Sequence, residues 1–239
     1  MQIARLLQTQ GFGSRKDCRL LVSAGLVTVN GAVIDNPTAE VDPAGLVFTV
    51  EGEEWAYHEK AYLMLYKPEG FECSRVPKHH PSVFNLLPPQ LGERGVQTIG
   101  RLDQDTTGLI LLSDDGQFIH VWSSGKKQTP KRYRVTLKHG HTPEMLTALR
   151  DGVELVDEPG ELVAAVSVEA IDAHTIWMTI TQGKYHQVKR MVAAAGNRVE
   201  ALHRDRIGGF ELPAVLEPGD WAWLTETHIA ALADFPHFD

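Results

Sequence analysis

The sequence of 239 residues predicts an α+β protein that combines a small N-terminal unit with a larger sheet domain. After residue 60, strand-like apolar runs outnumber helix-like patterns and do not alternate regularly with them, which disfavours a doubly wound parallel sheet. Before residue 50, two short helical patterns precede one hairpin signal. The content of 43% hydrophobic and 23% charged residues is typical of a globular protein.

The first 50 residues predict two helices followed by a hairpin. Apolar residues between Ile3 and Leu7 have helical spacing, and Gly11–Gly13 ends that helix. Ser14 with an aspartate three positions later is a capping-box-like start for a second helix. The segment Val27–Ile34 alternates around Asn-Gly, the strongest short hairpin signal. The polar side of the second helix carries three cations, Arg15, Lys16 and Arg19.

An acidic and polar segment separates the two parts. Residues 53–60 are predicted to form a linker between a domain over residues 1–52 and a domain over residues 61–239. In the second domain, short apolar runs predict strands over Tyr62–Tyr66, Leu109–Leu112, Tyr133–Leu137, Val163–Val168, Thr175–Ile180 and Trp221–Trp223. Helices are predicted over Pro143–Asp151 and Gln187–Ala195.

The net charge of −8 argues at first against a nucleic-acid partner, but the cations are unevenly distributed. Residues 126–138 carry six cations and no acid, residues 181–206 carry six against two acids, and residues 1–30 carry four against one. Phosphate binding depends on the charge at the contact face rather than on the total charge. Three basic segments therefore favour RNA binding, although any one of them alone would fit a solvated surface.

Cysteine and apolar patterns indicate the compartment. Only Cys18 and Cys73 occur, far apart, so neither a disulfide framework nor a cysteine zinc site is expected, and a reducing cytoplasm is predicted. No window approaches the roughly 20 apolar residues of a membrane span. Residues 1–7 lack the pattern of a signal peptide. The histidines lack metal-ligand spacing, so no metal is expected at His79, His80, His186 or His203.

The segment from Thr98 to Gly116 is the most informative for function. Its glycines bound a turn that carries Arg101 and Asp103, and the buried-strand pattern Leu109–Leu112 follows. A turn attached to a buried strand holds its carboxylate in a pre-set geometry, which a nucleophile or a general base needs. Taken alone, the same aspartate fits an ordinary turn in which it accepts backbone N–H bonds.

Other segments supply residue types that RNA chemistry requires. Tyr133 lies in a basic strand pattern with Lys131 and Arg132, and residues 182–191 place cations at the start of a helix. Chemistry on a base in folded RNA requires that base to flip into a pocket, where an aromatic ring stacks on it and cations hold the backbone. A carboxylate would then attack as a nucleophile, oriented by a cation beside it.

These segments resemble the RsuA-type family of pseudouridine synthases, which act on ribosomal RNA. The family motif Gly-Arg-Leu-Asp-x-x-Thr-x-Gly-Leu is matched by residues 100–109, and Lys-x-Tyr-x-Val by residues 131–135. Residues 183–191 read Gly-Lys-Tyr-His-Gln-Val-Lys-Arg-Met, and with residues 202–209 they look closest to the branch that modifies 16S rRNA. The resemblance covers nearly the whole chain.

The resemblance implies a role for each candidate site residue. Asp103 would be the nucleophile that breaks the uridine–ribose bond, and Arg101 would fill the space left by the flipped uridine. Tyr133 would stack on the base and help to remove the proton at its five-position. Lys189 would pair with Asp103, with Arg190 as the alternative one residue along. Further contacts to RNA or to the pocket are expected from Lys131, Arg132, Lys184, Arg190 and Leu202.

The N-terminal part resembles the αL RNA-binding domain named for a small-subunit ribosomal protein. That family binds RNA through the basic face of its second helix, which here implies Arg15, Lys16 and Arg19. The resemblances together imply a mixed, largely antiparallel sheet in the catalytic domain, no cofactor, no membrane association and a monomer. The implied partner is small-subunit ribosomal RNA, either naked or in a partly assembled particle.

Three alternatives remain open or are set aside at this point. Large-subunit ribosomal RNA is an alternative substrate, and a non-catalytic RNA-binding assembly factor is an alternative function. The spacing Asp103-x-Asp105-x-Thr107 also mimics the magnesium-dependent nucleophile loop of haloacid-dehalogenase-type phosphatases, but such a loop follows an apolar strand, whereas here the strand comes after it. Whether the nucleophile attacks the sugar or the base is also open.

Overall fold

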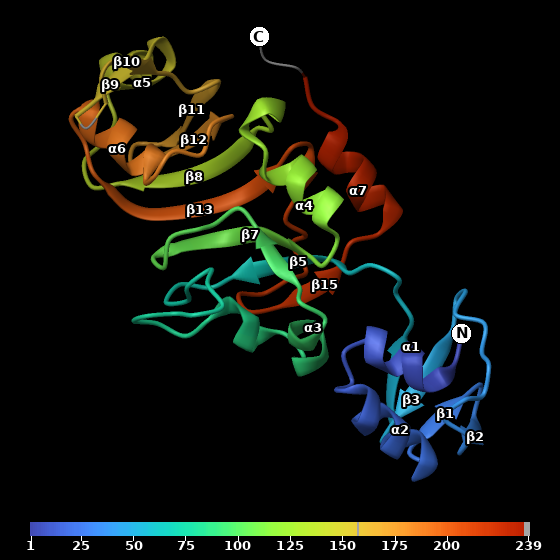
Figure 1. Ribbon diagram of the computed structural model, residues 1–239. Coiled ribbons are helices and arrows are strands. Elements are labelled where there is room, and N and C mark those ends of the chain that lie inside the picture. The colour runs from blue at the N-terminus through green and yellow to red at the C-terminus, as the bar shows by residue number, and fades with distance from the viewer. Residues whose placement is uncertain (157, 237–239) are drawn as a thin grey trace. The chain divides into compact units, whose positions relative to one another are not determined.

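The computed structural model describes residues 1–156 and 158–236, and the chain divides into two compact units (Figure 1). The first unit comprises Met1–Ala61 together with two later segments, Leu87–Gln97 and Ser113–Asp115. The second unit comprises Tyr62–Leu86, Thr98–Leu112 and Gly116–Asp239. Among the described residues, no helix is both long enough and apolar enough to cross a membrane.

The first unit packs two helices on a small antiparallel sheet. Helices α1 (Ile3–Thr9) and α2 (Arg15–Ser23) precede a four-stranded sheet of order β2-β1-β3-β4. The strands are β1 (Val27–Val29), β2 (Ala32–Ile34), β3 (Val47–Val50) and β4 (Glu53–Ala56). The predicted capping box is present, because Asp17 N–H donates to Ser14 Oγ and Ser14 N–H donates to the Asp17 carboxylate.

The core of this unit joins the predicted helical face to the sheet. Its fully buried side chains include Ile3, Leu6, Leu7, Cys18, Val22 and Phe48. Burial raises the pKa of the Cys18 thiol to about 11, so this cysteine packs as a small apolar residue rather than reacting as a thiolate.

Strand β4 occupies part of the segment for which the sequence predicts a linker. Of residues 53–60, the first four form this strand, whose Trp55 stands opposite Phe48 of β3 and packs against the core. The composition suggests a linker because four of the ten residues from 51 to 60 are glutamates and one is a glycine. The strand forms nevertheless, because it pairs with β3 along its length and Trp55 packs against the core.

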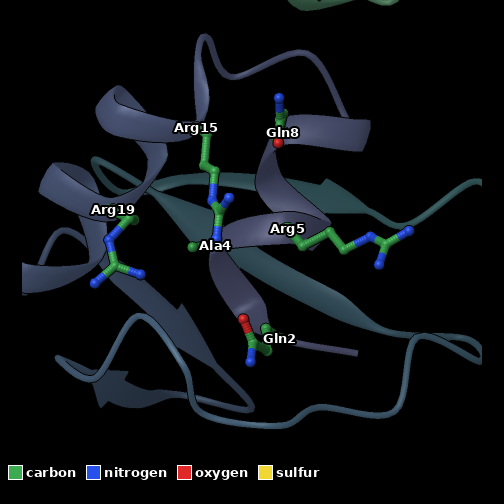
Figure 2. A pocket seen from close by; sticks show the side chains of 6 residues that line it. All are labelled: Gln2, Ala4, Arg5, Gln8, Arg15 and Arg19. Atoms are coloured by element: carbon green, nitrogen blue, oxygen red, sulfur yellow. The ribbon is translucent and has the colours of Figure 1, made fainter.

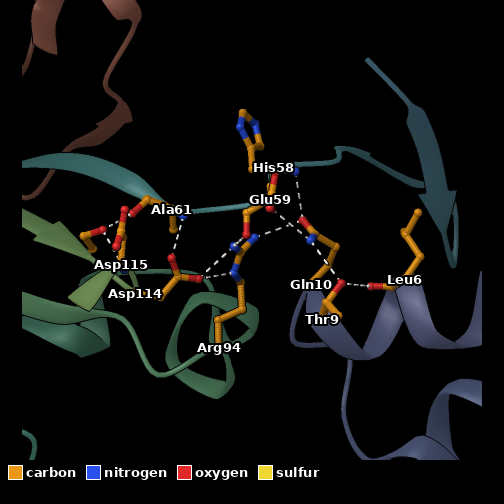
Figure 3. Close-up of polar contacts among 10 residues, drawn as sticks. Leu6, Thr9, Gln10, His58, Glu59, Ala61, Arg94, Asp114 and Asp115 are labelled. Carbon is orange, nitrogen blue, oxygen red and sulfur yellow. Dashed lines mark hydrogen bonds and ion pairs between the residues drawn. The ribbon is translucent and has the colours of Figure 1, made fainter. Parts of the chain in front are cut away.

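The later segments of the first unit are fastened to it by Arg94, which follows helix α3 (Pro89–Glu93) (Figure 3). The Arg94 guanidinium donates to Asp114 Oδ2 at 2.9 Å, to Gln10 Oε1 at 3.0 Å and to the Glu59 carbonyl at 3.3 Å. Gln10 in turn exchanges two hydrogen bonds with the backbone of His58, at 3.0 and 3.1 Å. One nearly buried arginine therefore ties together four separate stretches of chain.

The second unit is built on a nine-stranded mixed sheet. Seven of its strands follow the order β11-β12-β8-β13-β7-β5-β15, while β14 pairs with β13 and β6 with β7. Strand β8 pairs antiparallel with both β12 and β13, and β13 pairs parallel with β7. The strands are β5 (Tyr62–Lys67), β6 (Gln97–Ile99), β7 (Thr106–Ser113), β8 (Lys131–Leu137), β11 (Ser167–Asp172), β12 (Thr175–Ile180), β13 (Val199–Ile207), β14 (Phe210–Glu211) and β15 (Trp221–Trp223).

Helices and a small second sheet complete this unit. The helices are α4 (Gly116–Ser123), α5 (Pro143–Asp151), α6 (Gln187–Ala194) and α7 (Glu226–Ala233), and strands β9 (Val153–Leu155) and β10 (Glu158–Val163) form a two-stranded sheet. The predicted helix Pro143–Asp151 and the predicted strand Thr175–Ile180 have the predicted bounds. The single strand predicted over Val163–Val168 is wrong, because the chain leaves β10 at Val163 and enters β11 at Ser167.

Strand β7 lies within the sheet and carries the predicted apolar run. Leu109, Ile110, Leu111 and Leu112 are all essentially inaccessible to solvent, so both faces of the strand are covered. Gly108 has φ +110°, and a Cβ there would lie 2.1 Å from the carbonyl oxygen of Arg204. Only glycine allows β13 to approach β7 this closely.

Candidate active site

Asp103 lies on the turn that leads into β7, and backbone hydrogen bonds fix this turn. The Thr106 N–H donates to the Asp103 carbonyl at 3.1 Å, and the Gly70 N–H donates to the Gln104 carbonyl at 2.8 Å. Both bonds restrain the backbone that carries the carboxylate. The turn is therefore pre-organised rather than a mobile loop.

A buried lysine, Lys67, also restrains the Asp103 turn. Lys67, the last residue of β5, is fully buried, and its Nζ donates to the carbonyls of Thr106 at 2.8 Å, Pro68 at 3.0 Å and Gln104 at 3.2 Å. Burial lowers the pKa of the Lys67 ammonium, and nearby groups including Cys73, Asp105 and Asp103 oppose that shift. Three carbonyl acceptors compensate for the loss of water, so Lys67 acts as a strut for the turn.

Lys189 of α6 is brought to the Asp103 carboxylate from 86 residues away in the sequence. Its Nζ lies 3.1 Å from Asp103 Oδ2 and 2.6 Å from Asp105 Oδ1. Burial disfavours the charged forms of Lys189 and Asp105, but their hydrogen bonds and mutual attraction together have the larger effect. The pKa of Lys189 is therefore raised and that of Asp105 is lowered. The two aspartates therefore share one cation.

His186 is a further neighbour of Asp103, and the sequence assigns it no role beyond the expectation that it binds no metal. Its Nε2 lies 3.3 Å from Asp103 Oδ1, and its ring stacks on Tyr185 with centroids 3.8 Å apart. His186 has φ +48°, a left-handed conformation that is uncommon for a non-glycine residue and that occurs at functional sites. The available signal was the three-residue spacing of His186 and Lys189 at a helix start, which aligns them on one face.

Tyr133 and Leu202 lie on strands that neighbour the turn. Thr106, Leu202 and Val135 form one row across β7, β13 and β8, and Gly108, Arg204 and Tyr133 form the row two positions along, on the same face. Because paired residues share a face, Leu202 and Tyr133 are diagonal neighbours on the same face of the sheet. Both side chains are buried, at 6% and 8% exposure.

Arg101 lies two residues before Asp103 and is exposed to solvent. It is close enough to Cys73 to influence that thiol, whose pKa is raised by burial. The position leaves its side chain accessible to a ligand that approaches the Asp103 turn.

Several cations that the sequence predicts as RNA contacts have acidic partners within the unit. Arg132 pairs with Asp205 and Glu211, Lys184 pairs with Glu158 and Glu161, and Arg190 pairs with Glu158 at 3.0 Å. Lys131 donates to the Thr129 carbonyl, and burial lowers its pKa to about 8. The excess positive charge counted along the chain is thus partly neutralised by acids from other segments.

The first unit presents a basic cavity whose arginines form no ion pair with any residue that the structure describes. Gln2, Ala4, Arg5 and Gln8 of α1 and its cap, with Arg15 and Arg19 of α2, surround a cavity of about 290 Å³ (Figure 2). Figure 2 shows the Arg15 side chain crossing beside Ala4, whose small size leaves room for it. Sequence reasoning found Arg15 and Arg19 and missed Arg5, because Arg5 stands on the other helix.

Among residues 1–156 and 158–236, no cluster of three or more histidine, cysteine, aspartate or glutamate side chains has the arrangement of a metal site. The chemistry available at the Asp103 turn is therefore described through its carboxylates, cations and aromatic side chains. A carboxylate held between Lys189 and His186 suits nucleophilic attack.

The similarity of the chain to known proteins agrees with this site. A family model described as RNA pseudouridylate synthase matches residues 61–194, and an S4 domain model matches residues 1–47. The chain is 40% identical over 217 residues to ribosomal small subunit pseudouridine synthase A of Vibrio parahaemolyticus, covering 90% of this chain and 92% of the relative.

Two further comparisons extend over almost the whole chain. The protein of the same name from Escherichia coli is 37% identical over 233 residues, covering 97% of this chain and 100% of the relative. A crystal structure described as a pseudouridylate synthase superposes with a TM-score of 0.69 at 32% identity, covering 98% of this chain and 100% of the other. The predicted resemblance and fold class are confirmed, and the chain belongs to the RNA pseudouridine synthase family, with an S4 domain before the synthase domain.

Proposed function

We propose that this pseudouridine synthase converts a uridine of small-subunit ribosomal RNA to pseudouridine, with Asp103 as the nucleophile. The observation that carries the proposal is the Asp103 turn, restrained by Lys67 and contacted by Lys189 at 3.1 Å. The substrate is inferred from relatives that are named for the small subunit. Such a substrate places the enzyme in the cytoplasm.

The reaction needs no oxidant or reductant. The bond between uracil N1 and ribose C1′ breaks, a bond between C5 and C1′ forms, the C5 proton leaves and N1 gains a proton. The Asp103 carboxylate forms a transient covalent bond, to the ribose or to the base, and is released unchanged. Lys189 and His186 hold that carboxylate in a fixed orientation, which lowers the entropic cost of attack.

Tyr133 is proposed to stack on the flipped base and to take up the C5 proton. Its place on the same sheet face as Leu202, two rows from Thr106 at the start of β7, supports this role. Leu202 would pack against the base and exclude water. Arg101, exposed on the same turn, is proposed to occupy the gap that the flipped uridine leaves in the RNA.

The S4 domain is proposed to hold the RNA through its basic cavity. Arg5, Arg15 and Arg19 line the cavity, and Lys16 is exposed on the same helix as the last two. Guanidinium groups bind phosphate oxygens in pairs of hydrogen bonds. This contact is expected to hold the RNA regardless of its sequence, and the synthase unit would select the uridine.

A pseudouridine map of ribosomal RNA from cells with and without this protein tests the function. Loss at one small-subunit position is expected, restored by the wild-type chain and by Asp151→Asn, an exposed control, but not by Asp103→Asn. Loss at a large-subunit position would shift the substrate. An unchanged map, with the chain still bound to ribosomal RNA, would favour the non-catalytic assembly factor.

A further inference from the structure

A second cavity, of about 320 Å³, is lined by Thr107, Arg134 and His203, which lie on the sheet face opposite Tyr133, and it also reaches Leu202. Its walls come from four strands that are adjacent in the sheet, with Tyr66 on β5, Thr107 on β7, His203 on β13 and Arg134 on β8. Arg134 alternates with Tyr133 along β8, so the two side chains project from opposite faces. The volume is within the range of small-molecule pockets, roughly 300–1,000 Å³.

One side chain, Lys189, links this cavity to the proposed nucleophile. Asp105 lines it, and Lys189 contacts Asp105 and Asp103 together. The turn from Asp103 to Asp105 lies where β7 begins, so it has access to both sheet faces. An RNA strand with its uridine beside Tyr133 can cross this turn and place a nearby nucleotide in the cavity.

The cavity contains an aromatic surface held in place by a hydrogen bond. Tyr66 and His203 lie edge to face with ring centroids 5.4 Å apart, and His203 Nδ1 lies 2.9 Å from Thr107 Oγ1. Burial lowers the pKa of His203; the charge of Asp205 opposes this shift, and the charge of Arg134 adds to it. A neutral imidazole beside a phenol offers a surface on which a nucleobase can stack.

Charged groups at the cavity wall match the two ends of a nucleotide. Arg134 is exposed and forms no ion pair within the part of the chain that the structure describes, so its guanidinium is available to a phosphate. Glu69, Glu200 and Asp105 accept hydrogen bonds but cannot donate them when ionised. These carboxylates disfavour a second phosphate and favour a base edge rich in N–H donors.

We propose that this cavity binds an unpaired nucleotide of the substrate RNA that lies near the modified uridine, with its base against Tyr66 and His203 and its phosphate on Arg134. Guanine fits best, because N1–H and the N2 amino group offer two adjacent donors to one carboxylate. The inference rests on the proposed function and deepens it, since it assigns the selection of the substrate RNA to a pocket beside the site that holds the uridine.

The test measures pseudouridine formation on an RNA fragment spanning the mapped uridine, with each flanking guanosine replaced in turn by inosine, which lacks the N2 amino group. At one position inosine is expected to raise KM about tenfold with little change in kcat.

Arg134→Gln is expected to raise KM similarly, with partial rescue by Arg134→Lys. Glu69→Gln or Glu200→Gln should abolish the preference for guanosine. Lys138→Gln, a matched charge loss just beyond β8 and outside the cavity wall, should keep it.

Binding of the same fragments, followed by fluorescence anisotropy, separates the two proposals. Equal affinity and KM for guanosine and inosine at every flanking position would overturn the pocket assignment, as would an Arg134→Gln variant indistinguishable from Lys138→Gln. If the protein forms no pseudouridine but binds guanosine-containing RNA more tightly in an Arg134-dependent manner, the proposed function is contradicted and the pocket assignment is supported. If pseudouridine forms at the same rate whatever the flanking bases are, the proposed function is supported and the pocket assignment is contradicted.

Discussion

Lys189 bridges two aspartates, and its Nζ lies closer to Asp105 Oδ1, at 2.6 Å, than to Asp103 Oδ2, at 3.1 Å. In the sequence, Asp105 stands out only through the phosphatase-like spacing Asp103-x-Asp105-x-Thr107. The structure gives it a specific task, because it shares the cation that orients the proposed nucleophile. Asp105 also lines the cavity on the other face of the sheet.

The two aspartates are expected to differ sharply when each is replaced. Asp103→Asn should lower kcat by at least about 10³-fold while RNA affinity persists, because the nucleophile is lost and its shape is kept. Asp105→Asn should lower kcat only about tenfold, since Lys189 keeps one partner but is held less firmly. Single-turnover kinetics on the target RNA measures both effects, and equal losses would contradict separate roles.

Replacing Lys189 tests whether its charge or its packing matters. Lys189→Met should lower kcat roughly 100-fold by removing the cation between the carboxylates, and Lys189→Arg should restore most of the activity. Arg190→Met provides the comparison at the next helix position, because Arg190 pairs with Glu158. If the arginine variant were as slow as the methionine variant, the role of charge would be refuted.

Tyr133→Phe separates stacking from proton transfer. The ring remains, so KM should change little, whereas kcat should fall about 10²-fold or more if the hydroxyl takes the C5 proton. Steady-state kinetics with RNA deuterated at C5 provides the measurement, and a primary isotope effect should appear or grow in the variant. Unchanged turnover would exclude the hydroxyl from the proton transfer.

Glu72 is expected to make stability depend on pH in the acid range. Its carboxylate accepts backbone N–H bonds from His79, Lys78 and His80, which hold its pKa at about 2 instead of 4.5. Above pH 4.5 the group is charged in both folded and unfolded chains, so the stabilisation is fully present. As pH falls towards 2, the unfolded chain takes up the proton first and the contribution is lost.

The difference in unfolding free energy between wild type and Glu72→Gln, measured by denaturant titration, should therefore shrink between neutral pH and about pH 3. Amide hydrogen exchange at residues 78–80 should accelerate over the same interval. A constant difference would show that the carboxylate charge does not hold this loop.

Arg94→Met is expected to destabilise the first unit. The side chains of Arg94 and Asp114 are 3% and 13% exposed, and removal of one leaves the other charge in a nearly dry site. The cost should be about 3–5 kcal/mol, against less than about 0.5 kcal/mol for the exposed control Lys60→Met. Denaturant unfolding followed by tryptophan fluorescence, to which Trp55 contributes from the first unit, measures both. Equal effects would remove Arg94 as the tie between these segments.

Local sequence patterns predicted much of the fold because helix caps and apolar runs depend on interactions between residues that are close in the sequence. The capping box at Ser14 and the apolar run of β7 need only neighbouring residues, and both are present. The division of the Val163–Val168 segment between β10 and β11 could not be predicted from such local patterns. There Ala165 N–H bonds to the Leu149 carbonyl and Val166 N–H to the Thr179 carbonyl, partners that the chain supplies from other elements.

The sequence by itself determined the residue types of the site: an aspartate on a glycine-bounded turn, a tyrosine in a basic strand and a lysine at a helix start. Only the tertiary structure decided their partners. It put Lys189 rather than Arg190 beside Asp103, added His186, and neutralised Lys184 with Glu158. The reason is physical, since periodicity fixes which way a side chain points within its own element, whereas ion pairing depends on distances between elements that the packing of the sheet sets.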